Sequence, residues 1–137
     1  MIIKEFSKRQ INSSRDVAEL CSKILRAEES FDQDKEHFWG IGLDSQNKIK
    51  YLELITLGLL NQGMAHAREL FRLAIMTPVV SVIICHNHPA GNVAPSPEDK
   101  EITRKIVEAG KIIGIQLLDH VIIGKSGHYS FSDDGLI

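Results

Sequence analysis

Hydrophobic and polar positions follow two different periods along the chain, and the first clear period is helical. Near the N-terminus, apolar residues recur every three or four positions after the candidate helix caps at 12–14. These apolar residues are Val17, Leu20, Cys21 and Ile24. They predict an N-terminal helical arm within residues 1–30, and the polar, acidic segment 30–36 predicts a connector.

Strand patterns dominate the rest of the chain. Residues 37–44 and 48–58 predict two strands joined by a turn at 44–47, which makes an antiparallel hairpin. Residues 79–85 form a continuous apolar run rich in β-branched side chains, typical of a strand that is covered on both faces. Two further strands are predicted at 115–124 and 129–133.

Two more helices lie between these strands. The first has apolar residues at helical spacing over 67–75 and should end near Thr77, because Pro78 disfavours a helical conformation at the residue before it. The second begins at Ser96 or Pro97 and runs to about Gly110 or Gly114.

The order of these elements predicts the fold class. Strands that alternate with helices indicate an α/β fold, here an α+β mixed sheet with a central mixed β-sheet flanked by helices. No linker, repeat or low-complexity tract divides the sequence, so residues 1–137 are predicted to form a single domain.

Composition narrows the class of protein. Hydrophobic residues make up 43% and charged residues 25% of the 137 residues, which argues against disorder. A formal net charge of −2 supplies no basic footprint for a nucleic-acid partner. The sequence has no membrane-length apolar run, and we expect no signal peptide. Cys21 and Cys85 are predicted to be small buried hydrophobes in a reducing compartment. We therefore expect a cytoplasmic protein without a membrane segment, and the oligomeric state stays open.

Two histidines and an aspartate form the candidate chemistry. His86 and His88 follow the buried strand and are separated by one residue, so in an extended chain both rings point to one side. Asp99 lies one turn ahead of the apolar stripe of the last helix, and a carboxylate aimed at a core needs a partner or a metal. That stripe consists of Ile102, Ile106, Ala109 and Ile113. Two histidines, one carboxylate and an open position match a catalytic zinc site.

Helix-start chemistry offers an alternative explanation of the same segment. Ser96, Pro97 and Asp99 fit a capping box with serine at the N-cap, proline at N1 and an acid at N3. This alternative accounts for Ser96 and Asp99 but not for two histidines on one side of the chain. We therefore predict that one zinc ion binds through His86, His88 and Asp99.

The segment HNHPAGNVAPSPEDKEIT resembles the motif of the JAMM metallopeptidase superfamily and, more narrowly, of its RadC-like branch. The segment LLDHVIIG resembles the C-terminal strand of that branch, and the likeness spans roughly residues 36–131. The resemblance implies a mixed α/β sheet, a zinc ion, and hydrolysis of amide or isopeptide bonds in a peptide substrate.

The resemblance also assigns roles to residues around the metal. A glutamate just before a strand is the general base of the family, and Glu36 holds that position; its alternative is a solvated acid in the charged run 32–36. Glu53 is the second candidate for the base, although cross-strand pairing suits its place in a strand. Ser96 would donate to the oxyanion. Thr103 matches the motif and could hydrogen-bond Asp99, whereas His120 is predicted to be a core histidine and not a fourth ligand.

Other functions stay open beside the hydrolase. Ala90 replaces the usual serine of the signature, and MAHARELF replaces a proline-containing entry to the first packed helix. We expect no helix-hairpin-helix region in a chain of this length, so a DNA-repair-associated or nucleic-acid-processing role is only an alternative. A catalytically silent interaction module is another alternative. A zinc deaminase needs H-x-E and P-C-x-x-C, which this sequence lacks.

Overall fold

The computed structural model describes residues 2–3, 8–57 and 63–137. In this part of the chain, six strands alternate with four helices. The elements are β1 (Ile2–Ile3), α1 (Ser14–Arg26), α2 (Ser30–Gln33), β2 (His37–Leu43), β3 (Ile49–Leu57), α3 (Gly63–Met76), β4 (Ser81–Asn87), α4 (Pro97–Ile113), β5 (Gln116–Gly124) and β6 (Gly127–Ser130).

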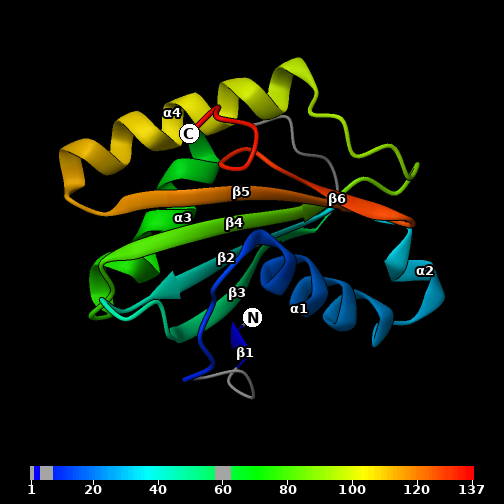
Figure 1. The fold of residues 1–137 in the computed structure, drawn as a ribbon, viewed down its shortest axis with the longest axis horizontal. Helices are drawn as coiled ribbons and strands as arrows, with labels where there is room; N and C mark the ends of the chain where they lie inside the picture. Colours follow the sequence, from blue (N-terminus) through cyan, green and yellow to red (C-terminus); the bar gives the residue numbers. More distant parts are fainter. Residues whose placement is uncertain (1, 4–7, 58–62) are drawn as a thin grey trace.

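All six strands belong to one sheet in the order β1-β3-β2-β4-β5-β6 (Figure 1). One neighbouring pair, β4 and β5, is parallel, and α4 makes the crossover between the two strands. Every other neighbouring pair is antiparallel. The sheet is therefore mixed, and the predicted α/β fold with its antiparallel 37–58 hairpin is confirmed over the described residues.

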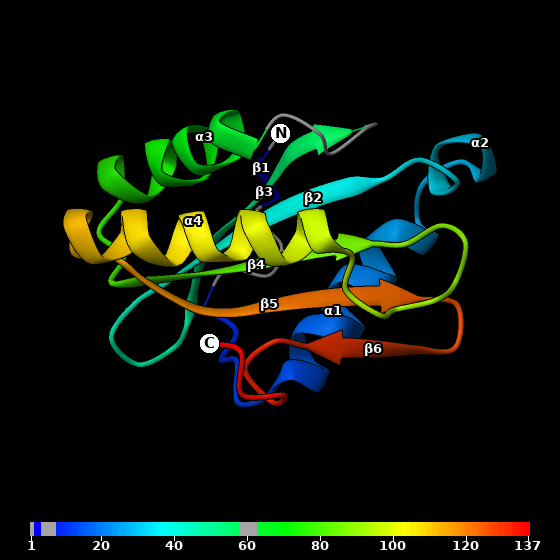
Figure 2. The ribbon, with the colours of Figure 1, turned by 90° about the horizontal axis from the view of Figure 1, so that it is seen from above.

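Helices cover both faces of this sheet (Figures 1 and 2). α3 and α4 lie on one face and α1 lies on the other. All seven residues of β2 and of β4 are buried, because these central strands are covered on both sides. The predicted N-terminal helix thus packs on the sheet: its apolar stripe joins Trp39 and Ile83 in one of the two hydrophobic clusters.

The two cysteines lie in the cluster under α1. Cys21 of α1 and Cys85 of β4 are both fully buried and are free thiols. Burial and the adjoining Cys21 thiol raise the pKa of Cys85 well above its ordinary value. The two residues therefore behave as small core side chains, as predicted.

Helix α4 combines several local signals. Ser96 caps its N-terminus, Pro97 occupies the first turn, and Gly114 ends it in a left-handed conformation with φ of 87°. Ile102 and Ile106 are buried as predicted. The expectation for Ile113 was wrong: the residue is 42% exposed, and Gly110 is buried instead, against Ile115 and Phe71.

Three short features differ from the sequence-based expectations. The connector at 30–36 contains the single-turn helix α2, which is too short to show a period. Strand β1 was not predicted, because two residues are too few to show an alternation of apolar and polar side chains. Their strand conformation comes from pairing with β3. β6 (Gly127–Ser130) begins and ends earlier than the strand expected at 129–133, because its pairing with β5 starts at Gly127 opposite Gly124 and residues 131–133 lie in a turn. Gly58, the last residue of the expected second strand, lies outside the described residues.

Among the described residues, none of the helices has both the length and the apolar character that crossing a bilayer requires.

Candidate metal centre

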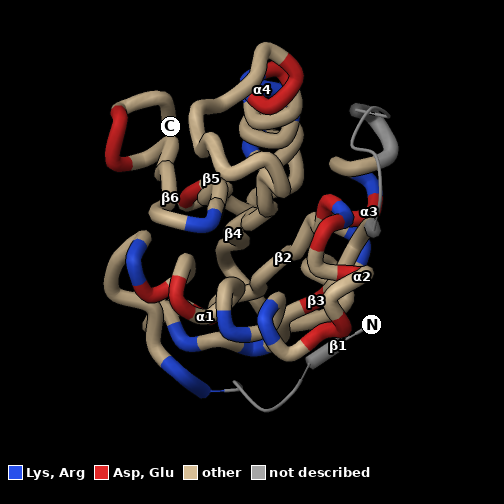
Figure 3. The backbone as a smooth tube through the Cα atoms, turned by 90° about the vertical axis from the view of Figure 1, so that its right-hand side faces the viewer, with Lys and Arg blue, Asp and Glu red and all other residues tan. Residues whose placement is uncertain are grey.

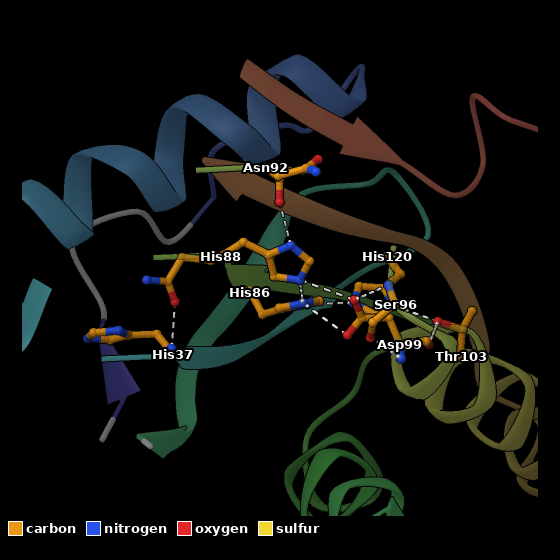
Figure 4. A network of polar contacts seen from close by, with 9 residues as sticks. His37, His86, His88, Asn92, Ser96, Asp99, Thr103 and His120 are labelled. Carbon is orange, nitrogen blue, oxygen red and sulfur yellow. Dashed lines mark hydrogen bonds and ion pairs between the residues drawn. The ribbon is translucent and has the colours of Figure 1, made fainter. Parts of the chain in front are cut away.

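The candidate site lies where three chain segments meet at one end of the sheet (Figure 4). β4 ends there with His86 and Asn87, and His88 follows directly. The antiparallel register pairs His86 with Phe38, so the start of β2 lies beside the end of β4. The N-terminus of α4 brings Asp99 to the same place.

The three predicted ligands converge on one point. Nε2 of His86 lies 3.0 Å from Nε2 of His88 and 3.2 Å from Oδ1 of Asp99. Nε2 of His88 lies 3.1 Å from Oδ2 of Asp99. Zn–N bonds of about 2.0–2.1 Å in a tetrahedron place ligand atoms about 3.3 Å apart, close to these separations. The described residues contain this one group of three or more candidate ligands.

The hydrogen bonds of the rings support metal binding at Nε2. Nδ1 of His88 lies 2.7 Å from the carbonyl oxygen of Asn92, which can only accept, so this nitrogen carries the proton. In the neutral ring, Nε2 of His88 therefore offers its lone pair to the cluster. Nδ1 of His86 is engaged by His120, which leaves Nε2 of His86 for the cluster as well. A donor set of two imidazole nitrogens and a carboxylate fits zinc.

Electrostatics couple Asp99 to both histidines. Burial of Asp99 raises the pKa of its carboxyl, but hydrogen bonds with His86 and His88 outweigh burial, and the net pKa is lowered. The pKa of His88 is raised, chiefly by its hydrogen bond with Asp99, while burial opposes the rise and the charge of Glu36 adds to it. Asp99 is therefore ionised at neutral pH, as a metal ligand must be.

Ser96 and Asp99 form the capping box that the helix-start explanation of this segment predicted. The backbone N–H of Asp99 donates to Oγ of Ser96 over 3.0 Å, and the N–H of Ser96 donates to Oδ2 of Asp99 over 2.9 Å. Asp99 thus serves both as the helix-start acid and as a member of the metal cluster. Oγ of Ser96 accepts a hydrogen bond, so its own proton is free to donate elsewhere.

Glu36 stands directly before β2 and is half-buried. Its carboxylate has no hydrogen bond or ion pair among the described residues, but its charge reaches His88. Asn87 holds the backbone on both sides of Glu36: its Oδ1 accepts from the N–H of His37 over 2.6 Å, and its Nδ2 donates to the carbonyl of Lys35 over 3.0 Å. Sequence patterns predict no role for Asn87 or His37, because the hydrogen bond between them depends on the pairing of β2 with β4.

Glu53, the second candidate for the base, lies outside the metal cluster. It is buried in β3, pairs with Gly40 in register, and forms an ion pair with Arg72 of α3 over 3.3 Å. Burial raises the pKa of Glu53, and the charge of Arg72 partly offsets that rise. Glu53 therefore contacts β2 and α3, and it lies away from the three candidate ligands.

His120 and Thr103 make contacts around the metal cluster that the sequence patterns did not predict. His120 is buried as predicted, but its Nε2 lies 2.7 Å from Nδ1 of His86 and its Nδ1 lies 2.6 Å from Oγ1 of Thr103. Thr103 donates to the backbone carbonyl of Asp99 over 2.8 Å, and not to the carboxylate. The contact of His120 with His86 follows from the parallel register of β4 and β5. This register pairs Ile84 with His120 and His86 with Ile122 on the same face.

A cavity of about 270 Å³ opens beside His88. Apolar side chains from α1 and β5 contribute to its wall, together with two cationic residues and Asn87. The wall includes Leu25, Arg26, Asn87, Ile123 and Lys125. Space for a bound molecule therefore adjoins one of the three candidate ligands.

Comparisons with known proteins show which family the chain resembles. The family model described as RadC-like JAB domain matches residues 11–136. A UPF0758 protein of Methanosarcina mazei is 42% identical over 133 residues, covering 97% of this chain and 56% of the relative. A UPF0758 protein of Methanococcoides burtonii is 43% identical over 136 residues, covering 99% of this chain and 57% of the relative. The chain spans about half the length of these curated relatives.

Proposed function

This chain belongs to the RadC-like JAB domain family, part of the JAMM superfamily, and from this membership and its ligand cluster we propose that it is a zinc-dependent hydrolase of peptide or isopeptide bonds. The observation that carries the proposal is the convergence of two imidazole nitrogens and one carboxylate within 3.0–3.2 Å of one another. A buried cluster of this kind, with a cavity beside it, supports hydrolysis better than a purely structural role.

His86, His88 and Asp99 would hold the zinc ion. When bound, zinc polarises a carbonyl group and lowers the pKa of a water molecule toward about 7. Glu36 then takes the proton from the attacking water and returns it to the nitrogen of the leaving amine. Its half-buried position before β2, where its charge reaches His88, suits that transfer.

Ser96 would contribute a hydrogen bond to the reaction. Its Oγ already accepts from the N–H of Asp99, which fixes the side chain and leaves the hydroxyl proton to point elsewhere. We propose that this proton is donated to the carbonyl oxygen as negative charge develops on it.

The cavity beside His88 would receive part of the peptide substrate. Its apolar wall, which includes Leu25 and Ile123, can cover a side chain, while Asn87 and the two cations border it. The substrate is therefore proposed to lie across the end of β4, between α1 and the N-terminus of α4.

Metal analysis of the purified protein tests this function first. Wild type is expected to hold one zinc ion per chain and His88→Ala to hold much less, whereas His128→Ala, at an exposed position on β6, should match wild type. Equal zinc in wild type and His88→Ala would contradict the assignment.

Cleavage of fluorogenic peptides and isopeptide-linked conjugates tests the chemistry. Glu36→Gln should keep its zinc and lose activity by about 10²–10⁴-fold, because only proton transfer is removed. Loss of zinc in that variant would make Glu36 a ligand instead of a base.

A further inference from the structure

We propose that His120 and Thr103 form a positioning pair that sets the tautomer of His86, so that its Nε2 presents a lone pair to the metal. This inference rests on the proposed metal site, and it adds two residues outside the ligand set. The pair connects the second ligand-bearing element, α4, with the end of β4 through a buried chain of hydrogen bonds (Figure 4).

The donor and acceptor of each hydrogen bond can be assigned by starting at Asp99. Its backbone carbonyl can only accept, so the hydroxyl of Thr103, 2.8 Å away, must donate to it. A threonine hydroxyl bonded to the carbonyl four residues earlier is a common arrangement in helices. With its proton used, Oγ1 of Thr103 can only accept from Nδ1 of His120, which lies 2.6 Å away.

The hydrogen bond between His120 and His86 determines which nitrogen of His86 carries the proton. His120 is 1% exposed, stacks on Phe131 with ring centroids 4.6 Å apart, and has no carboxylate at either ring nitrogen among the described contacts. A charged ring in such surroundings is costly, so His120 is neutral and its Nε2 accepts. The proton in the 2.7 Å contact between the rings therefore belongs to Nδ1 of His86.

The consequence is a prepared ligand. With its proton on Nδ1, a neutral His86 carries its lone pair on Nε2, the atom that lies 3.0 Å from His88 and 3.2 Å from Asp99. In this form Nε2 donates no hydrogen bond to Asp99, because such a bond requires a proton on Nε2. The carbonyl of Asn92 does the same for His88. Outer hydrogen-bond partners of this type fix ring orientation and raise metal affinity.

Substitutions that preserve shape separate this role from packing. His120→Phe keeps an aromatic ring against Phe131 but removes both hydrogen bonds, and Thr103→Val keeps the volume of the side chain but removes the hydroxyl. His120→Gln can still accept from His86 and donate to Thr103, so it is the conservative variant. Thr56→Val and His128→Phe are matched controls, because Oγ1 of Thr56 has no hydrogen-bond partner among the described residues and His128 is exposed on β6.

Nuclear magnetic resonance of the metal-free protein reads the tautomer directly. Long-range ¹H–¹⁵N correlations of His86, recorded about two pH units above the ordinary histidine pKa of about 6.5, should show the proton on Nδ1 in wild type and both controls. His120→Phe and Thr103→Val should show a mixture of tautomers, and His120→Gln should restore the wild-type pattern. An Nε2–H tautomer in wild type, or an unchanged pattern in His120→Phe, would overturn the proposal.

Zinc affinity measured by competition with a chelator gives the second readout. His120→Phe should bind zinc about 10–100-fold more weakly, with His120→Gln close to wild type. Unchanged affinity in a folded His120→Phe would contradict the role of the pair. Failure of wild type to bind zinc would contradict the proposed function, while the tautomer measurement would still decide the positioning role.

Discussion

Single side chains near the cluster serve two purposes at once. Ser96 is the clearest case, since its Oγ caps α4 and its proton is available to a substrate. We expect Ser96→Ala to lose about 1 kcal/mol of stability from the missing cap. The same variant should lower kcat by about 10²-fold if the hydroxyl also stabilises the oxyanion.

Ser96→Asp separates the two roles of Ser96. Aspartate can cap a helix but cannot donate when it is ionised, so this variant should keep near-native stability and remain as inactive as Ser96→Ala. Thermal unfolding and peptide cleavage measure the two effects. An active Ser96→Asp would show that Ser96 is only a helix cap.

Asn87 is expected to matter through the backbone that it holds. Asn87→Ala leaves the buried N–H of His37 without its side-chain acceptor, at a cost of about 1–3 kcal/mol, and removes one of the two contacts of the Lys35 carbonyl, which keeps Nδ1 of His37 over 2.8 Å. Because these two residues flank Glu36, cleavage should fall while zinc content stays at the wild-type level.

Zinc analysis and cleavage rates of Asn87→Ala, compared with the exposed Asn12→Ala, check this expectation. Loss of zinc in Asn87→Ala would mean that the residue supports the histidines, and not the base.

At the scale of elements, the N-terminus of α4 carries a pH-dependent ion pair with the end of β4. The hydrogen bond with Asp99 raises the pKa of His88, so this contribution to stability is complete below the unfolded histidine pKa of about 6.5 and is lost as pH rises through the raised value. The pKa of Asp99 is lowered in the folded state, so its contribution is complete above about 3.9 and is lost on acidification.

Metal reverses this pH dependence, because zinc requires His88 in its neutral form. Between about pH 6 and 8, raising the pH should weaken the metal-free protein through this pair and strengthen the zinc-loaded protein. Unfolding by urea, with zinc or with a chelator, measures both trends. The same direction of change in both samples would argue against zinc at His88.

Sequence periodicity could predict most of these elements, because α1, β4 and α4 each bury a continuous pattern. It also predicted the convergence of His86, His88 and Asp99, since i and i+2 positions and a helix stripe are local patterns. The contacts of Asn87 and His120 could not be predicted in this way. They depend on which residues of β2 and β5 align with β4, and that register is set by packing between distant segments.

The charge distribution over the molecule argues against the alternative of a nucleic-acid partner. Lysine and arginine positions are interspersed with acidic positions around the end of the molecule drawn in Figure 3, and the net charge is −2. We expect this chain to bind duplex DNA only weakly, with affinity that collapses as salt rises.

Fluorescence anisotropy with a labelled duplex at several salt concentrations measures this affinity. Tight binding at physiological salt, with a preference for sequence or structure, would favour a DNA-repair-associated role.

The contact between Cys21 and Cys85 provides a natural probe of how the molecule opens. Both thiols are fully buried between α1 and β4, so a thiol-specific reagent can reach them only when α1 leaves the sheet. The metal cluster lies on the opposite face, with His86. If α1 detaches alone, zinc should leave the labelling rate unchanged; if labelling requires global unfolding, zinc should slow it through its preference for the folded chain.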